Sequence, residues 1–379
     1  MKNSDKAGKP VLPLKKRGTV AVIGPLADAP SNMQGMWSPS SFPSYTSLVD
    51  GIREVADEGV KVLYAKGSWL YDDPSYEKNF TNSDFERDSR SDDALLREAL
   101  SVAARADVIV AAIGESKDMS GEAASRTDIT IPSNQKKLLQ ALVATGKPVV
   151  LTLFTGRPLD LSWESENVPA ILNTWFAGSE GAYAIADVLF GKVNPSAKIT
   201  MSFPRSVGQI PVYYNHKNTG RPGPDDRFAK YTSQYIDSPN DPLYPFGFGL
   251  SYTTFEYSDI TLSSSEMKDA PVKASVTVRN TGSVDGDEIV QLYVRDLVGS
   301  VTRPVKELKG FQKVHIAAGE SVTVEFEITR DMLGFYSTPD FFAKKAGALE
   351  GEFVVEPGDF DIMAGPDSRN VSVARLVLK

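Results

Sequence analysis

The chain has 379 residues, 41% of them hydrophobic, no cysteine, and a formal net charge of −8 at pH 7. This length suits about two domains, the absence of cysteine excludes disulfides and thiolate metal sites, and the negative charge argues against a nucleic-acid partner, because phosphate binding needs clustered Lys and Arg. No apolar run reaches the ~20 residues of a membrane-spanning helix, and none follows Met1, so we expect neither membrane insertion nor a signal peptide in this chain.

After a lead-in of residues 1–17, residues 18–214 alternate continuous apolar runs with segments of helical periodicity. We expect strands at residues 20–23, 60–64, 108–113, 148–154 and 170–172, and helices at residues 94–104, 135–144 and 181–190. Strands that are apolar throughout are typical of a parallel sheet covered on both faces. Residues 71–93 show no periodicity and are expected at the surface. The pattern predicts an α/β sandwich domain with a mostly parallel sheet.

The rest of the sequence differs in composition and in the periodicity of its apolar residues. Residues 215–261 are rich in Pro, Gly, Tyr and Asn and are expected to form an ordered connector. In residues 262–379 apolar and polar residues alternate instead, so that every second residue from Val272 to Val278 shares one strand face. Turn signals separate these runs at intervals typical of an all-β sandwich.

The segment from Ile113 to Gln135 follows an apolar strand and is crowded with Gly, Ser, Asp and Glu. Open α/β sheets bind ligands outside the carboxyl ends of their strands, and long ordered loops are usually functional. We therefore expect the functional site on this loop. The side chains considered for its chemistry are Glu115, Asp118, Glu122, Arg126 and Asp128.

Glu122 is the candidate general acid/base of this loop. Its neighbours on both sides are small residues, Ser120-Gly121 and Ala123-Ala124, so its carboxyl would stay accessible to a substrate. Arg126 would orient this carboxyl or bind sugar hydroxyls. Asp118 and Asp128 are more simply explained as charges in a solvated loop.

Other kinds of site have weaker support. Trp37, Trp69, Trp175 and Phe176 could stack on sugar rings, although each alone is more simply a core residue. Trp175 and Phe176 rank first, because they follow a sheet strand. Neither of the two histidines has a second ligand at metal spacing, so no metal or cofactor is expected. A serine nucleophile has little support, since the sequence lacks Gly-x-Ser-x-Gly.

Several longer motifs resemble the C-terminal half of bacterial glycoside hydrolase family 3 β-glucosidases, especially the periplasmic type. They follow the family's order along nearly the whole chain: Val20–Asp28 (VAVIGPLAD), Glu122–Pro132 (EAASRTDITIP), Trp175–Gly181 (WFAGSEG), Met201–Pro211 (MSFPRSVGQIP), Tyr244–Tyr252 (YPFGFGLSY) and Arg303–Phe311 (RPVKELKGF). The resemblance implies an (α/β)6-type sandwich followed by a fibronectin type III-like β-sandwich, in agreement with the pattern of strands and helices.

The resemblance also implies a reaction, the retaining hydrolysis of terminal β-D-glucosyl residues from a β-glucoside or oligosaccharide. Glu122 matches the family's general acid/base, although Ser125-Arg126 stands where many members have Asp-Arg. The family's nucleophile is an Asp on an N-terminal (β/α)8 barrel. That barrel would be supplied in cis or in trans, and this chain alone is expected to be incomplete and inactive. The family's members imply a periplasmic or secreted location.

One segment of this chain resembles the nucleophile motif locally, and two other functions compete with glycoside hydrolysis. Asp84, in Ser83-Asp84-Phe85, lies in a charged segment without a preceding apolar strand, which argues against it as the nucleophile. A stand-alone carbohydrate-binding or interaction module would use the same loop and aromatic residues without catalysis. A Rossmann-like nucleotide binder is disfavoured, because the first strand ends in Gly-Pro-Leu-Ala-Asp without the glycine fingerprint.

Overall fold

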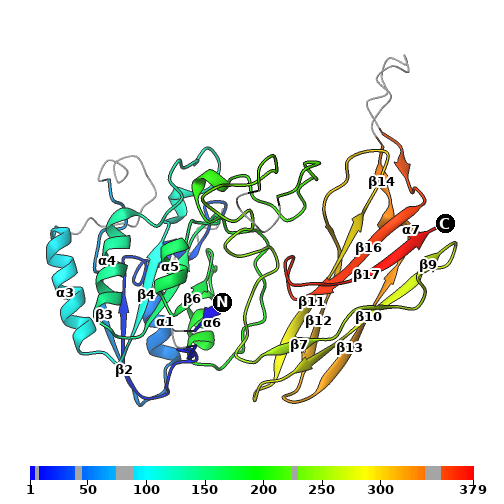
Figure 1. The fold of residues 1–379 in the computed structure, drawn as a ribbon. Coiled ribbons are helices and arrows are strands. Elements are labelled where there is room, and N and C mark those ends of the chain that lie inside the picture. Colours follow the sequence, from blue (N-terminus) through cyan, green and yellow to red (C-terminus); the bar gives the residue numbers. More distant parts are fainter. Residues whose placement is uncertain (5–7, 39–44, 74–88, 224–228, 338–350) are drawn as a thin grey trace. The chain divides into compact units, whose positions relative to one another are not determined.

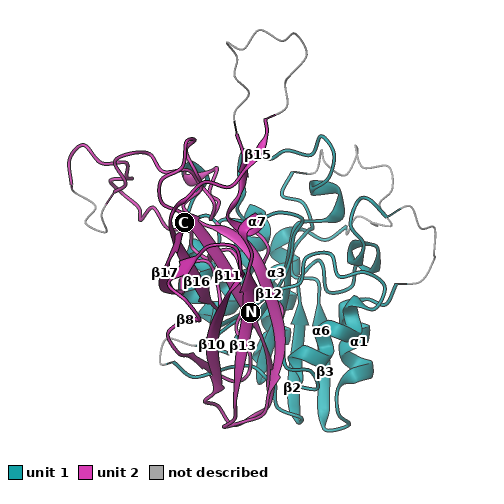
Figure 2. Cartoon of the chain, turned by 90° about the vertical axis from the view of Figure 1, so that its right-hand side faces the viewer, with its two compact units in different colours: residues 1–195, 204–208 teal, residues 196–203, 209–379 magenta. Residues whose placement is uncertain are grey.

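A computed structural model of the chain describes residues 1–4, 8–38, 45–73, 89–223, 229–337 and 351–379 (Figure 1). The chain divides into two compact units, drawn in two colours in Figure 2. Unit 1 comprises residues 1–195 and 204–208, and unit 2 comprises residues 196–203 and 209–379. Unit 1 combines helices with a sheet and unit 2 is mainly β, so the predicted fold class is confirmed.

Unit 1 is built on a six-stranded sheet in the order β1-β6-β5-β4-β2-β3. The strands are β1 (Lys2–Asn3), β2 (Gly18–Ile23), β3 (Val60–Ala65), β4 (Val108–Gly114), β5 (Val149–Phe154) and β6 (Ala170–Asn173). All pairings from β2 to β6 are parallel, and only β1 adds antiparallel to β6. Every residue of β5 is buried, so helices and loops cover both faces of the sheet. The expected parallel sheet is confirmed, whereas β1 is too short to give a sequence signal.

The helices of unit 1 pack in pairs on this sheet, α1 against α6 and α3 against α4. They are α1 (Leu48–Val55), α3 (Asp92–Ala104), α4 (Ser133–Ala144), α5 (Ser162–Asn167) and α6 (Gly181–Leu189). Short 3-10 helices also occur in this part of the chain, namely η1 (Pro30–Met33), η2 (Lys117–Met119) and η3 (Val207–Gln209). The sequence patterns missed α1 and α5. Gly51 in α1 has a low intrinsic helix propensity but is required there, because a Cβ would lie 2.7 Å from the Cβ of Ala182.

Unit 2 contains a sheet in the order β13-β10-β7, with β8 also paired to β10, and a sheet in the order β12-β11-β16-β17-β9. The strands are β7 (Phe255–Tyr257), β8 (Thr261–Leu262), β9 (Glu266–Met267), β10 (Val272–Asn280), β11 (Gly286–Asp296), β12 (Glu307–Ile316), β13 (Ser321–Ile328), β16 (Gly358–Gly365) and β17 (Ser372–Leu378), with the pair β14 (Phe335–Tyr336) and β15 (Phe353–Val354) and the single helical turn α7 (Arg330–Leu333). The alternating residues of β10 are buried in one core, as their period predicts.

Two expectations about the segment 71–93 have different outcomes. Tyr71 is buried, and its hydroxyl lies 2.9 Å from that of Ser116, so a surface position is wrong for this residue. The aromatic ring of Tyr71 belongs to the core beneath the loop after β4. Asp84 lies outside the described residues.

Candidate functional site

The loop that carries the predicted site leaves the sheet at the end of β4. Gly114, the last residue of that strand, has a φ of +142°, and a Cβ there would lie 1.9 Å from the carbonyl oxygen of Phe154 in β5. Only glycine can adopt this conformation so close to the neighbouring strand. The chain therefore turns away at the carboxyl edge of the parallel strands, where open α/β sheets place their ligands.

Glu122 lies at the corner of a tight turn from Gly121 to Ala124. The N–H of Ala124 donates to the carbonyl of Gly121 at 3.3 Å, and Ala123 adopts a positive φ of 58°. The Glu122 side chain is exposed and forms no hydrogen bond or ion pair with the described part of the chain. Its carboxyl is therefore available to an incoming group.

Exposed apolar side chains lie beside this turn. A Cβ at Gly121 would lie 3.0 Å from the Cγ of Met36 and 3.7 Å from the Nε1 of Trp37. Met36 is 43% exposed and Trp37 is 71% exposed. An indole with so much accessible surface can stack on a sugar ring, and it lies close to the turn of Glu122.

The two aromatic residues after β6 are half-buried. A Cβ at Gly156 would lie 3.0 Å from the ring of Phe176 and 2.1 Å from the hydroxyl oxygen of Ser120, so Phe176 lies near the start of the Glu122 turn. Trp175 has a positive φ of 53°, which is unusual for a bulky residue. Such strain persists only where surrounding contacts impose it, and it marks the end of β6 as a constrained segment.

Charged residues of the loop differ sharply in their surroundings. Asp128 is exposed and accepts a hydrogen bond from the N–H of Thr130 at 2.8 Å, and this bond lowers the pKa of Asp128. Asp118 is only 8% exposed, so the expectation of a solvated charge is wrong for it. Burial raises the pKa of Asp118, and the hydroxyl of Tyr71 lies 3.5 Å from its carboxylate.

Glu115 is fully buried and is the most heavily bonded side chain of the loop. Its Oε1 lies 2.9 Å from Nη1 of Arg126 and 3.0 Å from Nε of Arg157. Its Oε2 lies 2.8 Å from the hydroxyl of Thr155 and 3.2 Å from the N–H of Gly156. Three hydrogen-bond donors and a second guanidinium in ion-pair contact therefore surround this buried carboxylate at the ends of β4 and β5, which shields it from a substrate.

The two arginines that bind Glu115 also bind the loop backbone. Nη2 of Arg157 donates to the carbonyls of Met119 and Ala124, the latter at 2.8 Å. Nη2 of Arg126 donates to the carbonyl of Thr130 at 3.2 Å. Within the described residues Arg126 thus contacts Glu115 rather than Glu122, and its contact with a sugar stays a prediction.

Two buried amide side chains fix the ends of the loop. Gln135, at the start of α4, accepts from the N–H of Gly114 at 2.9 Å and donates to the carbonyls of Gly114 at 3.0 Å and Leu70 at 2.7 Å. Asn32 accepts from the N–H of Lys117 at 2.9 Å. Neither residue belongs to a recognisable motif, and their roles follow only from the three-dimensional arrangement.

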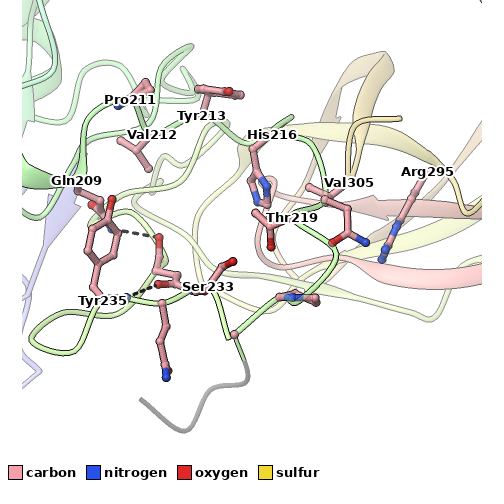
Figure 3. A pocket seen from close by; sticks show the side chains of 15 residues that line it. Gln209, Pro211, Val212, Tyr213, His216, Thr219, Ser233, Tyr235, Arg295 and Val305 are labelled. Atoms are coloured by element: carbon pink, nitrogen blue, oxygen red, sulfur yellow. Dashed lines mark hydrogen bonds between the residues drawn. The ribbon is translucent and has the colours of Figure 1, made fainter. Parts of the chain in front are cut away.

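Unit 2 contains a separate pocket of about 600 Å³, shown in Figure 3. It is lined by Gln209, Pro211, Val212, Tyr213, His216, Asn218, Thr219, Pro222, Gly223, Ser233, Gln234, Tyr235, Asn240, Arg295 and Val305. The amides of Gln209 and Asn240 are used in bonds to the surrounding backbone. None of these lining residues is Asp or Glu, so they offer no carboxyl for acid–base catalysis.

The described residues offer neither a metal site nor a membrane-spanning helix. No group of three or more His, Asp or Glu side chains there is arranged to hold a metal ion. His315 instead lies 2.8 Å from a carboxylate oxygen of Asp287. None of the helices in those same residues combines the length and apolar character needed to cross a bilayer.

Comparison with known proteins identifies relatives along the whole chain. Residues 1–252 match the glycosyl hydrolase family 3 C-terminal domain, and residues 288–368 match a fibronectin type III-like domain. The chain is 49% identical over 364 residues to a periplasmic β-glucosidase of Salmonella typhimurium, covering 95% of this chain and 46% of that protein. A β-xylosidase of Formosa agariphila is 39% identical, with coverages of 94% and 45%.

Solved structures agree with the sequence relatives. The β-glucosidase from Listeria innocua in complex with isofagomine superposes with a TM-score of 0.82 at 35% identity, covering 100% of this chain and 48% of that chain. A β-glucosidase from Bifidobacterium adolescentis superposes with a TM-score of 0.75 at 29% identity, with coverages of 100% and 51%. The chain spans about half the length of the relatives that it matches.

Proposed function

Because this chain belongs to glycosyl hydrolase family 3, as its motifs predicted, we propose that it is the part of a retaining β-glucosidase that supplies the general acid/base. The residue in this role is Glu122. The observation that carries the proposal is the exposed Glu122 carboxyl at the carboxyl edge of the sheet, without a competing partner among the described residues. General acid–base catalysis requires a carboxyl with this access.

In the proposed reaction Glu122 first protonates the leaving oxygen of the glycosidic bond. It then removes a proton from the water that attacks the glycosyl-enzyme intermediate. A retaining enzyme needs a second carboxyl ~5–5.5 Å from the first as its nucleophile. We place that nucleophile on a (β/α)8 barrel, supplied in cis or in trans, so that this chain alone does not turn over substrate.

Substrate contacts in this proposal come from the surroundings of the turn. Trp37, Trp175 and Phe176 offer ring faces to the sugar, and Arg126 offers a partly exposed guanidinium. The substrate class is a terminal β-D-glucoside or an oligosaccharide, since relatives of this chain include proteins named β-glucosidase. A periplasmic or secreted location is proposed on the same ground.

The test of this proposal is Glu122→Ala in a protein in which the barrel is present. Loss of a general acid/base typically costs ~10²–10⁴-fold in rate. On a cellobiose-like substrate with a poor leaving group, glycosylation of the enzyme should fall by that factor. On an aryl glucoside with an acidic phenol the loss in this first step should be far smaller, and added azide should restore turnover and release the β-glycosyl azide.

The matched control for this test is Asp128→Ala, which removes an exposed carboxyl from the same loop. It should retain the wild-type dependence on the leaving group. The proposal is wrong if azide rescue and leaving-group dependence follow Asp128→Ala and not Glu122→Ala. A binding module without catalysis is the second candidate, favoured by the exposed Trp37. In that case Trp37→Ala would weaken oligosaccharide binding while Glu122→Ala, with the barrel present, would leave turnover unchanged.

A further inference from the structure

We infer that Glu115 is a positioning residue that holds the Glu122 turn through Arg157 and Arg126. The inference rests on the proposed role of Glu122 and adds the groups that fix its geometry. Glu115 bonds to both arginines, and the arginines bond to three carbonyls of the same loop, at residues 119, 124 and 130. One buried carboxylate is thus connected to both sides of the turn.

The turn needs such support because its own bonds are few. A single 3.3 Å hydrogen bond from Ala124 to Gly121 closes it, and Ala123 has a positive φ that costs energy for a residue with a side chain. A conformation of this kind persists only where surrounding contacts impose it. Arg157 provides those contacts, because it donates to the carbonyl of Ala124, the last residue of the turn, and to that of Met119 just before the turn.

The chemistry of the two partners suits this role. The guanidinium is planar and offers five donors in a fixed arrangement, so one Arg157 can form an ion pair with Glu115, whose Oε1 lies 3.0 Å from Nε, and donate hydrogen bonds to two carbonyls through Nη2. A lysine has a single ammonium group and cannot span these positions. Because two cations face one carboxylate, removal of the Glu115 charge would leave two guanidinium groups without a counterion in a partly buried site.

Buried ion pairs are in general weak contributors to stability, and their best-attested use is to specify one geometry. The contacts of Glu115 agree with that use, since both of its arginine partners donate hydrogen bonds to loop carbonyls and not to an α-helix or a strand. A merely structural role would affect unit 1 as a whole. A positioning role would affect the turn and the chemical step.

The first measurement uses the chain as it is. Backbone amide order parameters are measured by NMR relaxation for residues 121–124 in the wild type, Glu115→Gln and Arg157→Lys. Values near ~0.85 indicate a rigid backbone, and values below ~0.6 indicate a flexible one. We expect the wild-type turn to be rigid and both variants to move toward the flexible value, with the strands of unit 1 unchanged.

The matched control is Glu164→Gln, which alters another fully buried carboxylate of unit 1. Glu164 lies 3.6 Å from Nζ of Lys136, and its partner is on α4 rather than on the turn. This variant should leave the turn rigid. A rigid turn in both Glu115→Gln and Arg157→Lys, or equal loosening in Glu164→Gln, would overturn the inference. If Glu115→Gln does not fold, Arg157→Lys decides the question, because it keeps the charge balance.

The second measurement uses a protein in which the barrel is present. A misplacement of about 1 Å at a reacting group can cost ~10²-fold in rate. We therefore expect kcat of Glu115→Gln to fall by up to about that factor on poor leaving groups, with KM changed little and a smaller loss on good leaving groups. An equal loss on all leaving groups would indicate general destabilisation and contradict positioning.

The two proposals fail in different ways. If Glu122→Ala shows no dependence on the leaving group, the assigned acid/base is wrong, whatever Glu115 does. If Glu122→Ala behaves as an acid/base while Glu115→Gln and Arg157→Lys keep wild-type kcat and a rigid turn, only the positioning role is wrong.

Discussion

Replacing Gln135 with leucine should destabilise unit 1 far more than its small change in size suggests. The Gln135 side chain is fully buried and forms three hydrogen bonds to the backbone, two with Gly114 and one with Leu70. Gln135→Leu removes one acceptor and two donors at once. It leaves the N–H of Gly114 and two carbonyls without these partners.

The magnitude follows from the number of backbone groups affected. Each buried polar group left without a partner costs ~1–3 kcal/mol, so three of them cost about 3–9 kcal/mol before the structure relaxes. Unfolding free energies are ~5–15 kcal/mol for a whole domain. We therefore expect Gln135→Leu to remove a large part of the free energy of unfolding of unit 1.

The assay can report on unit 1 alone, because all four tryptophans of the chain, Trp37, Trp69, Trp163 and Trp175, lie in it. Urea unfolding followed by tryptophan fluorescence gives the midpoint of that unit. Gln140→Leu is the matched control, since Gln140 lies on the same helix with its side chain exposed. A midpoint for Gln135→Leu no lower than that for Gln140→Leu would refute the reasoning.

Three further outcomes are expected. The isolated chain should show no turnover of an aryl β-glucoside, and hydrolysis that survives purification and is lost in Asp84→Ala would contradict the proposed division of the site. Residues 255–379, which contain every strand of unit 2 from β7 to β17, should fold alone as an all-β domain, and a lack of dispersed amide signals by NMR would contradict this. Burial raises the pKa of Glu164, so its contribution to stability is present below the ordinary value of 4.5 and is lost as pH rises above it. Glu164→Gln should therefore flatten the decline in unit 1 stability as pH rises above 4.5, and an unchanged slope would argue against the assigned cause.

The strands of unit 1 were predictable because burial on both faces produces runs that are apolar throughout. The run in β4 located both the strand and the loop that follows it. The accessibility of the Glu122 carboxyl was also predictable, since its small neighbours cannot cover it. Helix α1 was not predicted, although Ser47 caps it and Leu48, Val49 and Ile52 form its buried face, while Gly51 packs against Ala182.

The surroundings of the charged residues could not be predicted in the same way. Glu115 follows directly on β4, and nothing in the neighbouring sequence indicates that it is buried. Its partners come from two separate loops, Arg126 after the turn and Arg157 after β5. Whether a carboxylate is solvated or fully bonded depends on residues that only folding brings together, and the burial of Asp118 has the same origin.

The bonds from Arg157 to the turn have a consequence for how related sequences can diverge. The Arg157 guanidinium donates hydrogen bonds to the backbone carbonyls of Met119 and Ala124, and not to the side chains between them. Substitutions at solvent-facing positions beside the turn, such as Ser125, can therefore change the surface around Glu122 without loosening these backbone contacts. An arrangement of this kind lets the surface around the proposed acid/base group change by point mutation while the position of that group is kept.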